Sequence, residues 1–183
     1  NHTPISIMDS VNNHDDSVFY IEKHIADDVR TAGRAAVQSF GVKSRFVHFE
    51  FFRLTQDHAY LGKRGRIIGL EVNYRPSGGF TPDMINYACS TDVYKDWADM
   101  VAFDRLTKAD YPEKYYCVSA GCRKEKHYLH SYEEVMAAYK DDIMMTTELP
   151  EVLASAMGDR LYLARFAEKE DMDAFISYVF ATA

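Results

Sequence analysis

The chain has 183 residues, of which 47% are hydrophobic and 27% are charged, a composition typical of a globular protein with a buried core. Its formal net charge is -7 at pH 7, which argues against a nucleic-acid partner because such binding depends on clustered Lys and Arg. No apolar run approaches the roughly 18 to 20 residues that a membrane-spanning helix needs, so we expect no membrane partner either.

The cysteines and the start of the sequence bear on its cellular setting. Three cysteines and no signal peptide favour reduced thiols and a cytoplasmic protein. The sequence begins at Asn1, and residues 1–17 are polar without a targeting pattern. We interpret residues 1–17 as a linker or a truncated upstream segment, and we expect the chain to be a fragment of a longer protein.

Periodicity predicts a strand, a helix and two further strands in the first half of the chain. Residues 18–23 have the composition of a strand, and the apolar positions of residues 28–40 recur at helical spacing, followed by Gly41 as a stop. We expect this helix to bury one apolar stripe. Residues 45–54 and 66–75 are rich in aromatic and branched side chains and are predicted strands.

Two helices are predicted next. One runs from Pro82 toward Cys89, and the other runs through Phe103 after the capping residues Thr91 and Asp92. The order of strand, helix, two strands and two helices predicts an α+β fold in which an antiparallel sheet is flanked by helices.

The pattern changes near residue 108, where residues 110–113 interrupt the helical run. Beyond this point we predict strands at residues 114–121 and 160–166 and helices at residues 131–139, 149–156 and 169–180. The first of these helices begins with a capping box, Ser131 to Glu134. The predicted organisation is therefore a subdomain at residues 18–108 and a small α/β extension at residues 109–183.

Polar side chains gather on one face of the predicted strand at residues 66–75, because alternate residues of a strand share a face. This face carries Gly69, Glu71, Asn73 and Arg75. The opposite face, which we expect to pack into the core, carries Ile68, Leu70, Val72 and Tyr74. Carboxylate and amide oxygens suit a hard cation, and a guanidinium suits a phosphoryl group, so the polar face is typical of a metal and phosphate site.

The preceding strand adds two polar side chains on one face, His48 and Glu50. If the two strands form a hairpin with its centre at Tyr60–Leu61, then Glu50 stands opposite Glu71 and His48 stands opposite Asn73. Two carboxylates directly opposite each other repel unless a cation lies between them. This register therefore predicts a metal site at Glu50, Glu71 and Asn73.

A glycine loop, Pro76-Ser77-Gly78-Gly79, follows the second strand. Without side chains, its backbone N–H groups can approach an anion closely. A plainer interpretation stays open, because a half-exposed strand also alternates apolar with polar residues and a Gly-Gly pair is most often an ordinary turn. Spacing alone does not separate these two interpretations.

The residues themselves resemble a known family. His48-Phe49-Glu50-Phe51-Phe52 and Gly69-Leu70-Glu71-Val72-Asn73-Tyr74-Arg75-Pro76, with Gly78-Gly79, look like the last third of an ATP-grasp domain. The resemblance covers residues 18–103 and is to the branch that includes biotin carboxylase and the large subunit of carbamoyl-phosphate synthase. It implies that residues 18–108 are the C-terminal subdomain of an ATP-grasp fold.

This resemblance implies roles for the site residues and for two cofactors, ATP and magnesium or manganese. Glu50 and Glu71 would ligate the metal ions on the ATP phosphates, and Asn73 would complete the shell of the second ion. Arg75 would act as the catalytic residue that contacts the transferred phosphoryl group. The glycine loop of Gly78 and Gly79 would lie beside the nucleotide.

The implied activity is that of a carboxylate ligase, which uses ATP to form an acyl phosphate that an amine or similar nucleophile attacks. The implied partners are a small-molecule carboxylate and a small-molecule nucleophile, with a homodimer as the expected assembly. Bicarbonate is unsupported as a substrate, because the stretch Pro76–Gly79 lacks the acid that biotin carboxylase has there. No biotin-attachment motif is present either.

The family's phosphate-binding lysines and glycine-rich loop lie upstream of the part that this chain resembles. Residues 1–17 contain nothing that matches them. We therefore expect the isolated fragment to bind ATP weakly and to be inactive by itself. The alternative is a non-catalytic module derived from the ATP-grasp fold that serves as a binding or subunit-contact surface.

A basic loop in the predicted extension carries Lys124, Lys126, His127 and His130. These side chains are candidates for an anion patch. A charged loop after a strand is usually only solvated, and we favour that interpretation. The sequence assigns no function to residues 109–183.

Overall fold

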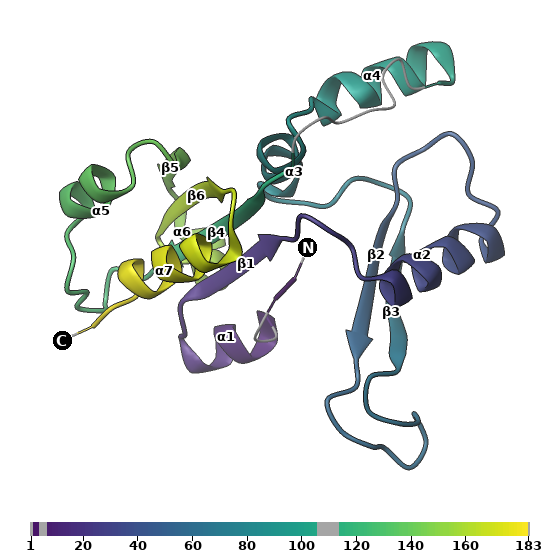
Figure 1. Ribbon diagram of the computed structural model, residues 1–183, viewed down its shortest axis with the longest axis horizontal. Coiled ribbons are helices and arrows are strands. Elements are labelled where there is room, and N and C mark those ends of the chain that lie inside the picture. The colour runs from purple at the N-terminus through teal and green to yellow at the C-terminus, as the bar shows by residue number, and fades with distance from the viewer. Residues whose placement is uncertain (1, 4–6, 106–113, 183) are drawn as a thin grey trace. The chain divides into compact units, whose positions relative to one another are not determined.

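The computed structural model describes residues 2–3, 7–105 and 114–182, and the chain divides into two compact units (Figure 1). The first unit contains residues 1–23, 83–91 and 111–183, and the second contains residues 24–82 and 92–110. In both units antiparallel strands are flanked by helices, which confirms the predicted α+β class. The predicted boundary near residue 108 lies outside the described residues.

These units group the residues differently from the predicted ranges 1–17, 18–108 and 109–183. The strand β1 (Ser17–Ile21), predicted to open the first subdomain, pairs antiparallel with β4 (Tyr116–Cys122) in the first unit. Part of the predicted linker forms the helix α1 (Ile7–Asn13). Pairing between segments so distant in the chain leaves no local signature in the sequence.

The first unit is built on a four-stranded antiparallel sheet with the order β1-β4-β6-β5. Its remaining elements are β5 (Ile143–Glu148), β6 (Arg160–Phe166), α5 (Tyr132–Ala138), α6 (Glu151–Met157) and α7 (Lys169–Val179). The helix α7 packs against β4 and β6 (Figure 1). Between them lies a core of buried side chains: Tyr20, Val118, Ala120, Val135, Tyr162, Ala164, Phe166, Met172, Phe175 and Val179.

The start of α5 confirms the predicted capping box. The Ser131 side chain accepts a hydrogen bond from the Glu134 backbone N–H at 3.2 Å, and the Glu134 carboxylate accepts one from the Ser131 N–H at 2.8 Å. Both bonds satisfy backbone donors that a helix start leaves without partners.

The end of α6 lies directly against the backbone of β4. A Cβ atom placed on Gly121 would be 1.7 Å from the carbonyl oxygen of Met157, so only glycine fits at this position. The Asp159 N–H donates to the Cys122 carbonyl oxygen at 2.7 Å, which fastens the chain after α6 to the same strand.

The second unit combines the helix α2 (Asp27–Ser39), the hairpin of β2 (His48–Arg53) and β3 (Ile67–Asn73), and the helix α4 (Val93–Phe103). A further helix, α3 (Thr81–Cys89), begins in the second unit and continues in the first. The start of α2 is tied to the end of β2, because both carboxylate oxygens of Asp28 accept hydrogen bonds from the Arg53 guanidinium. This pairing, together with the Val29 N–H, lowers the pKa of Asp28.

The apolar faces of the second unit are less buried than predicted. No residue of α2 is fully buried, although its apolar residues recur where the periodicity places them. The face of β3 that was predicted to pack into the core is largely exposed: Leu70 is 56% exposed and Tyr74, just past the strand, is 46% exposed. This part of the prediction was wrong. Periodicity predicts which side chains share a face, whereas the depth of burial depends on what packs against that face.

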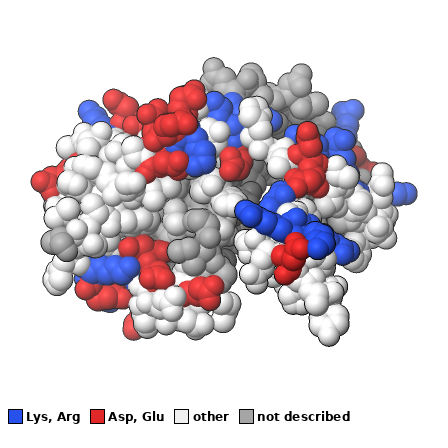
Figure 2. All heavy atoms as spheres, turned by 60° about the horizontal axis from the view of Figure 1, so that its bottom comes forward, with Lys and Arg blue, Asp and Glu red and all other residues white. Residues whose placement is uncertain are grey.

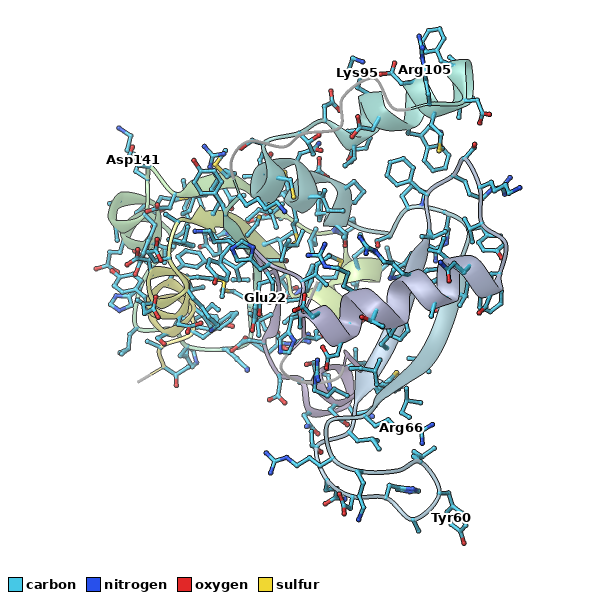
Figure 3. All side chains as sticks on the ribbon, turned by 45° about the vertical axis from the view of Figure 1, so that its right-hand side comes forward. Glu22, Tyr60, Arg66, Lys95, Arg105 and Asp141 are labelled. Atoms are coloured by element: carbon cyan, nitrogen blue, oxygen red, sulfur yellow. The ribbon has the colours of Figure 1, made fainter. Side chains whose placement is uncertain are left out.

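The loop between β2 and β3 is ordered by its own side chains. The Asp57 carboxylate accepts hydrogen bonds from the Lys63 ammonium at 2.7 Å and from the Arg64 N–H at 2.9 Å. Nδ1 of His58 accepts bonds from the backbone N–H groups of residues 60 and 61, both at 3.2 Å. Tyr60, which is 92% exposed, lies at the tip of this loop (Figure 3).

Basic and acidic side chains lie beside one another on the face shown in Figure 2. Two ion pairs of the chain are Lys63 with Asp57 at 2.7 Å and Lys169 with Asp173 at 2.8 Å. Solvent screens exposed pairs of this kind, so burial of apolar side chains dominates the stability. None of the described helices combines the length and the apolar character needed to cross a membrane.

Candidate functional site

The predicted site lies on the β2–β3 hairpin. In the structure His48 pairs with Asn73 and Glu50 pairs with Glu71, which confirms the register predicted for these residues. Directly opposite residues of an antiparallel pair have Cβ atoms about 4.5–5.5 Å apart. The two glutamates therefore start from neighbouring positions on one face of the hairpin.

The pairing shifts immediately after Glu50. Phe51 pairs with Gly69, and Phe52 pairs with Ile68, so the strands are offset by one residue on the side of the loop. The predicted hairpin centre holds for residues 48–50 but not beyond them. Such a bulge bends and twists the strand that carries it.

His48 lies beside Glu50 on β2. Its Nε2 atom lies 3.4 Å from Oε1 of Glu50, and its side chain is mostly buried. Within the described residues, Nδ1 of His48 and Nδ2 of Asn73 are buried polar atoms without a hydrogen-bond partner. Buried polar atoms normally have partners, so these two atoms call for an explanation. Alternation along the strand predicts that His48 shares the site face, but sequence reasoning assigned it no role.

The side chains present are suited to magnesium carried by a nucleotide. Magnesium is usually held by one or two carboxylates, while water and phosphate oxygens fill its other positions. Glu50 and Glu71 supply two carboxylates, and Asn73 supplies an amide oxygen. In the part of the chain that the structure describes, no three His, Cys, Asp or Glu side chains form a group that could hold a metal by themselves.

The residues predicted to contact phosphate lie beyond the end of β3. The strand ends at Asn73, so strand alternation does not extend to Arg75, and the role of Arg75 stays a prediction. The Arg75 side chain is exposed and donates a hydrogen bond from Nη1 to the Pro76 carbonyl oxygen at 2.9 Å. Gly79 has a φ of 59°, and nothing lies within 4 Å of a Cβ placed on Gly78, so this loop is open to an incoming group.

Comparisons with known proteins bear on the fold. No protein-family model matches the sequence, and no curated protein matches it. Among solved structures, the chain is similar to the crystal structure of phosphoribosylglycinamide synthetase from Anaerococcus prevotii, with a TM-score of 0.51 and 15% sequence identity. The chain shares the fold of part of this synthetase. The alignment covers 88% of this chain and 44% of the synthetase, so the chain spans less than half of that protein.

The likeness to phosphoribosylglycinamide synthetase supports the predicted ATP-grasp fold. At 15% identity it shows the fold alone and does not bear on the predicted branch of biotin carboxylase and carbamoyl-phosphate synthase. The ligand roles of Glu50, Glu71 and Asn73 stay predictions.

Proposed function

We propose that the chain is part of an ATP- and magnesium-dependent ligase that joins a small-molecule carboxylate to an amine or similar nucleophile. The observation that supports this proposal most is the pairing of Glu50 with Glu71 on neighbouring strands of one hairpin. The similarity of fold to a synthetase supports the same class of reaction. The proposed chemistry is ATP-driven formation of an acyl phosphate, followed by attack of the nucleophile.

In this proposal Glu50, Glu71 and Asn73 supply the protein oxygens that bind magnesium, or manganese in its place. When bound, the ion neutralises negative charge on the phosphates of ATP. Arg75 exchanges its hydrogen bond to the Pro76 carbonyl for a charged contact with the transferred phosphoryl group. The open loop at Gly78–Gly79 lets backbone N–H groups approach the same anion.

His48 orients two of these ligands in the proposal. Its Nε2 atom lies 3.4 Å from Oε1 of Glu50, and its Nδ1 atom has no hydrogen-bond partner within the described residues. Asn73 stands directly opposite and has an unpartnered Nδ2 donor. If that donor bonds to Nδ1 of His48, the Asn73 side-chain oxygen is turned free for the metal. Nδ1 of His48 and Nδ2 of Asn73 are then hydrogen-bonded to each other in the assembled site.

The test is Glu71→Gln in the full-length protein, measured by calorimetric titration of ADP with and without magnesium. We expect the magnesium-dependent affinity to fall by about tenfold or more, because a hydrogen bond or ligand that carries charge contributes about 1.5–3 kcal/mol. The exposed Glu125→Gln removes the same charge outside the site and serves as the matched control. Unchanged magnesium-dependent binding in Glu71→Gln would refute the assignment.

The second candidate is a non-catalytic module that uses the fold as a subunit-contact surface. The exposed apolar side chains of Leu70 and Tyr74 favour it, because apolar faces of this kind are common at protein contacts. The same titration separates the two candidates. A full-length protein that binds ADP equally with and without magnesium, or not at all, supports the contact module.

A further inference from the structure

A cavity of about 580 Å³ lies in the first unit, where β4 ends and β6 begins. Its volume is within the range of about 300–1,000 Å³ found for small-molecule sites. Its lining is basic although the whole chain is acidic: it includes Arg123, Lys124, Lys126 and Arg160, against Glu148 and Asp159. All of these residues belong to the first unit, whereas Glu50 and Glu71 belong to the second, so the inference does not depend on the proposed ligase function.

The loop that brings the lysines to the cavity is held in place by polar contacts. The Tyr128 hydroxyl donates to Asp16 at 2.5 Å and accepts from the Arg123 N–H at 2.7 Å. The ring of His130 stacks on Tyr178 with centroids 3.6 Å apart. This wall of the cavity is therefore preorganised, so ordering it on binding costs little entropy.

Arg123 stabilises the same wall and is not available to a ligand. Its buried guanidinium donates to three backbone carbonyl oxygens, those of Asp15 at 2.6 Å, Ala154 at 3.2 Å and Ser155 at 3.1 Å. These bonds occupy the guanidinium and connect Asp15, just before β1, to the last turn of α6.

The floor of the cavity is apolar and aromatic. Among the apolar and aromatic lining residues, Tyr132 and Leu149 are partly exposed, whereas Val135, Tyr162 and Val179 are buried. The Arg160 guanidinium lies 4.5 Å from the centroid of the Tyr132 ring, so a positive charge is fixed beside a flat aromatic surface. A charge next to an apolar floor favours a ligand with a charged head and a flat apolar body.

The two cations at the mouth of the cavity, Arg160 and Lys124, each have an acidic partner, and Arg160 also hydrogen-bonds to Tyr162. Arg160 donates from Nη2 to Glu148 at 2.6 Å, but the Glu148 side chain is 78% exposed. The Lys124 ammonium is 3.5 Å from Asp159 and is itself exposed. One member of each pair is exposed, Glu148 in the first and Lys124 in the second, so solvent weakens both pairs and an anion can compete for the two cations.

We propose that this cavity binds a small organic anion that joins one carboxylate or phosphate group to a flat apolar body. Arg160 and Lys124 contact the anionic group, and the partly exposed Tyr132 and Leu149 receive the apolar body. The basic loop, for which the sequence favoured plain solvation, then forms one wall of a ligand site.

Calorimetry on the 183-residue chain tests this proposal with four probes: phenyl phosphate, benzoate, inorganic phosphate and neutral benzamide. We expect saturable 1:1 binding of phenyl phosphate or benzoate, and the tighter of the two identifies the preferred head group. Inorganic phosphate and benzamide should each bind at least about tenfold more weakly, because each lacks one half of the recognised chemistry. No saturable binding of either aromatic anion would overturn the proposal.

Substitutions locate the binding. Arg160→Gln should weaken binding of the preferred anion by about tenfold or more, while Lys140→Gln, an exposed lysine outside the cavity, should leave it within about twofold. If Arg160→Gln fails to fold by near-ultraviolet circular dichroism, Lys124→Gln takes its place with the same expectation. Equal effects of the cavity variant and of Lys140→Gln would show general electrostatic attraction and refute the site.

Discussion

Gly121→Ala tests the contact between β4 and the end of α6. The new Cβ atom would lie 1.7 Å from the Met157 carbonyl oxygen, whereas Cβ contacts under 3.0 Å are essentially never seen. The obstacle is backbone, so no side-chain rotation relieves it, and the end of α6 must move away from the strand. Overpacking of this kind costs about 1–3 kcal/mol. The movement also breaks the 2.7 Å hydrogen bond between the Asp159 N–H and the Cys122 carbonyl, which adds about 1 kcal/mol.

We therefore expect Gly121→Ala to destabilise the first unit by about 3 kcal/mol. The measurement is urea unfolding followed by the NMR signals of Val118 and Leu163, two buried residues of that unit. At a slope of about 1.5 kcal/mol per molar, the midpoint should fall by roughly 2 M. A midpoint within about 0.3 M of the parent would refute the reasoning.

The matched control for this experiment lies on the same strand. Ser119→Ala removes a buried hydroxyl that has no hydrogen-bond partner within the described residues. Since burying an unsatisfied hydroxyl costs about 1–3 kcal/mol, this variant should raise the midpoint or leave it unchanged. A lower urea midpoint for Gly121→Ala, together with an unchanged or higher midpoint for Ser119→Ala, would show that the cost at position 121 is steric and not a general sensitivity of β4.

Three further predictions follow from individual contacts. In Arg53→Gln the pKa of Asp28 should rise toward its ordinary value of 3.8, as measured by carbon NMR, and an unchanged pKa would contradict this role for Arg53. Because the folded pKa of Asp28 is lowered, the pairing stabilises the protein above the unfolded pKa, and this stabilisation is lost as the pH falls through the folded pKa. Burial raises the pKa of Cys117 and of Cys122 to about 12. At pH 8 iodoacetamide should therefore label both thiols roughly a thousandfold more slowly in the folded protein than in urea, as followed by mass spectrometry. Comparable labelling rates in the two conditions would contradict this prediction. Ser131→Ala should destabilise the start of α5 by about 1 kcal/mol, seen as faster amide hydrogen exchange there, and unaltered exchange would mean that the cap contributes nothing.

The sequence predicted best those elements whose signals are local. The strand at residues 160–166 has the predicted bounds, and α5 begins at the predicted capping box. The helix α1 and the strand β5 were not predicted. Residues 143–148 form a strand because they pair with β6, and their two methionines gave no strand signal of their own.

The candidate site was predicted in part for the same reason. Alternation and a single hairpin centre place Glu50 opposite Glu71 because both arguments need only neighbouring strands. Alternation does not extend to Arg75 because β3 ends at Asn73, and a strand end depends on the pairing of its last residues. The burial of Leu70 was wrong, since it depends on packing partners that a single strand does not reveal.

The offset after Glu50 has a consequence for how the hairpin tolerates change. A one-residue slip of a strand turns every side chain to the opposite face, so an insertion in the loop would normally threaten both glutamates. Here the irregularity lies between the paired glutamates and the loop. We therefore expect this irregular step to absorb a change in the length of the loop around Tyr60 while Glu50 and Glu71 keep their pairing.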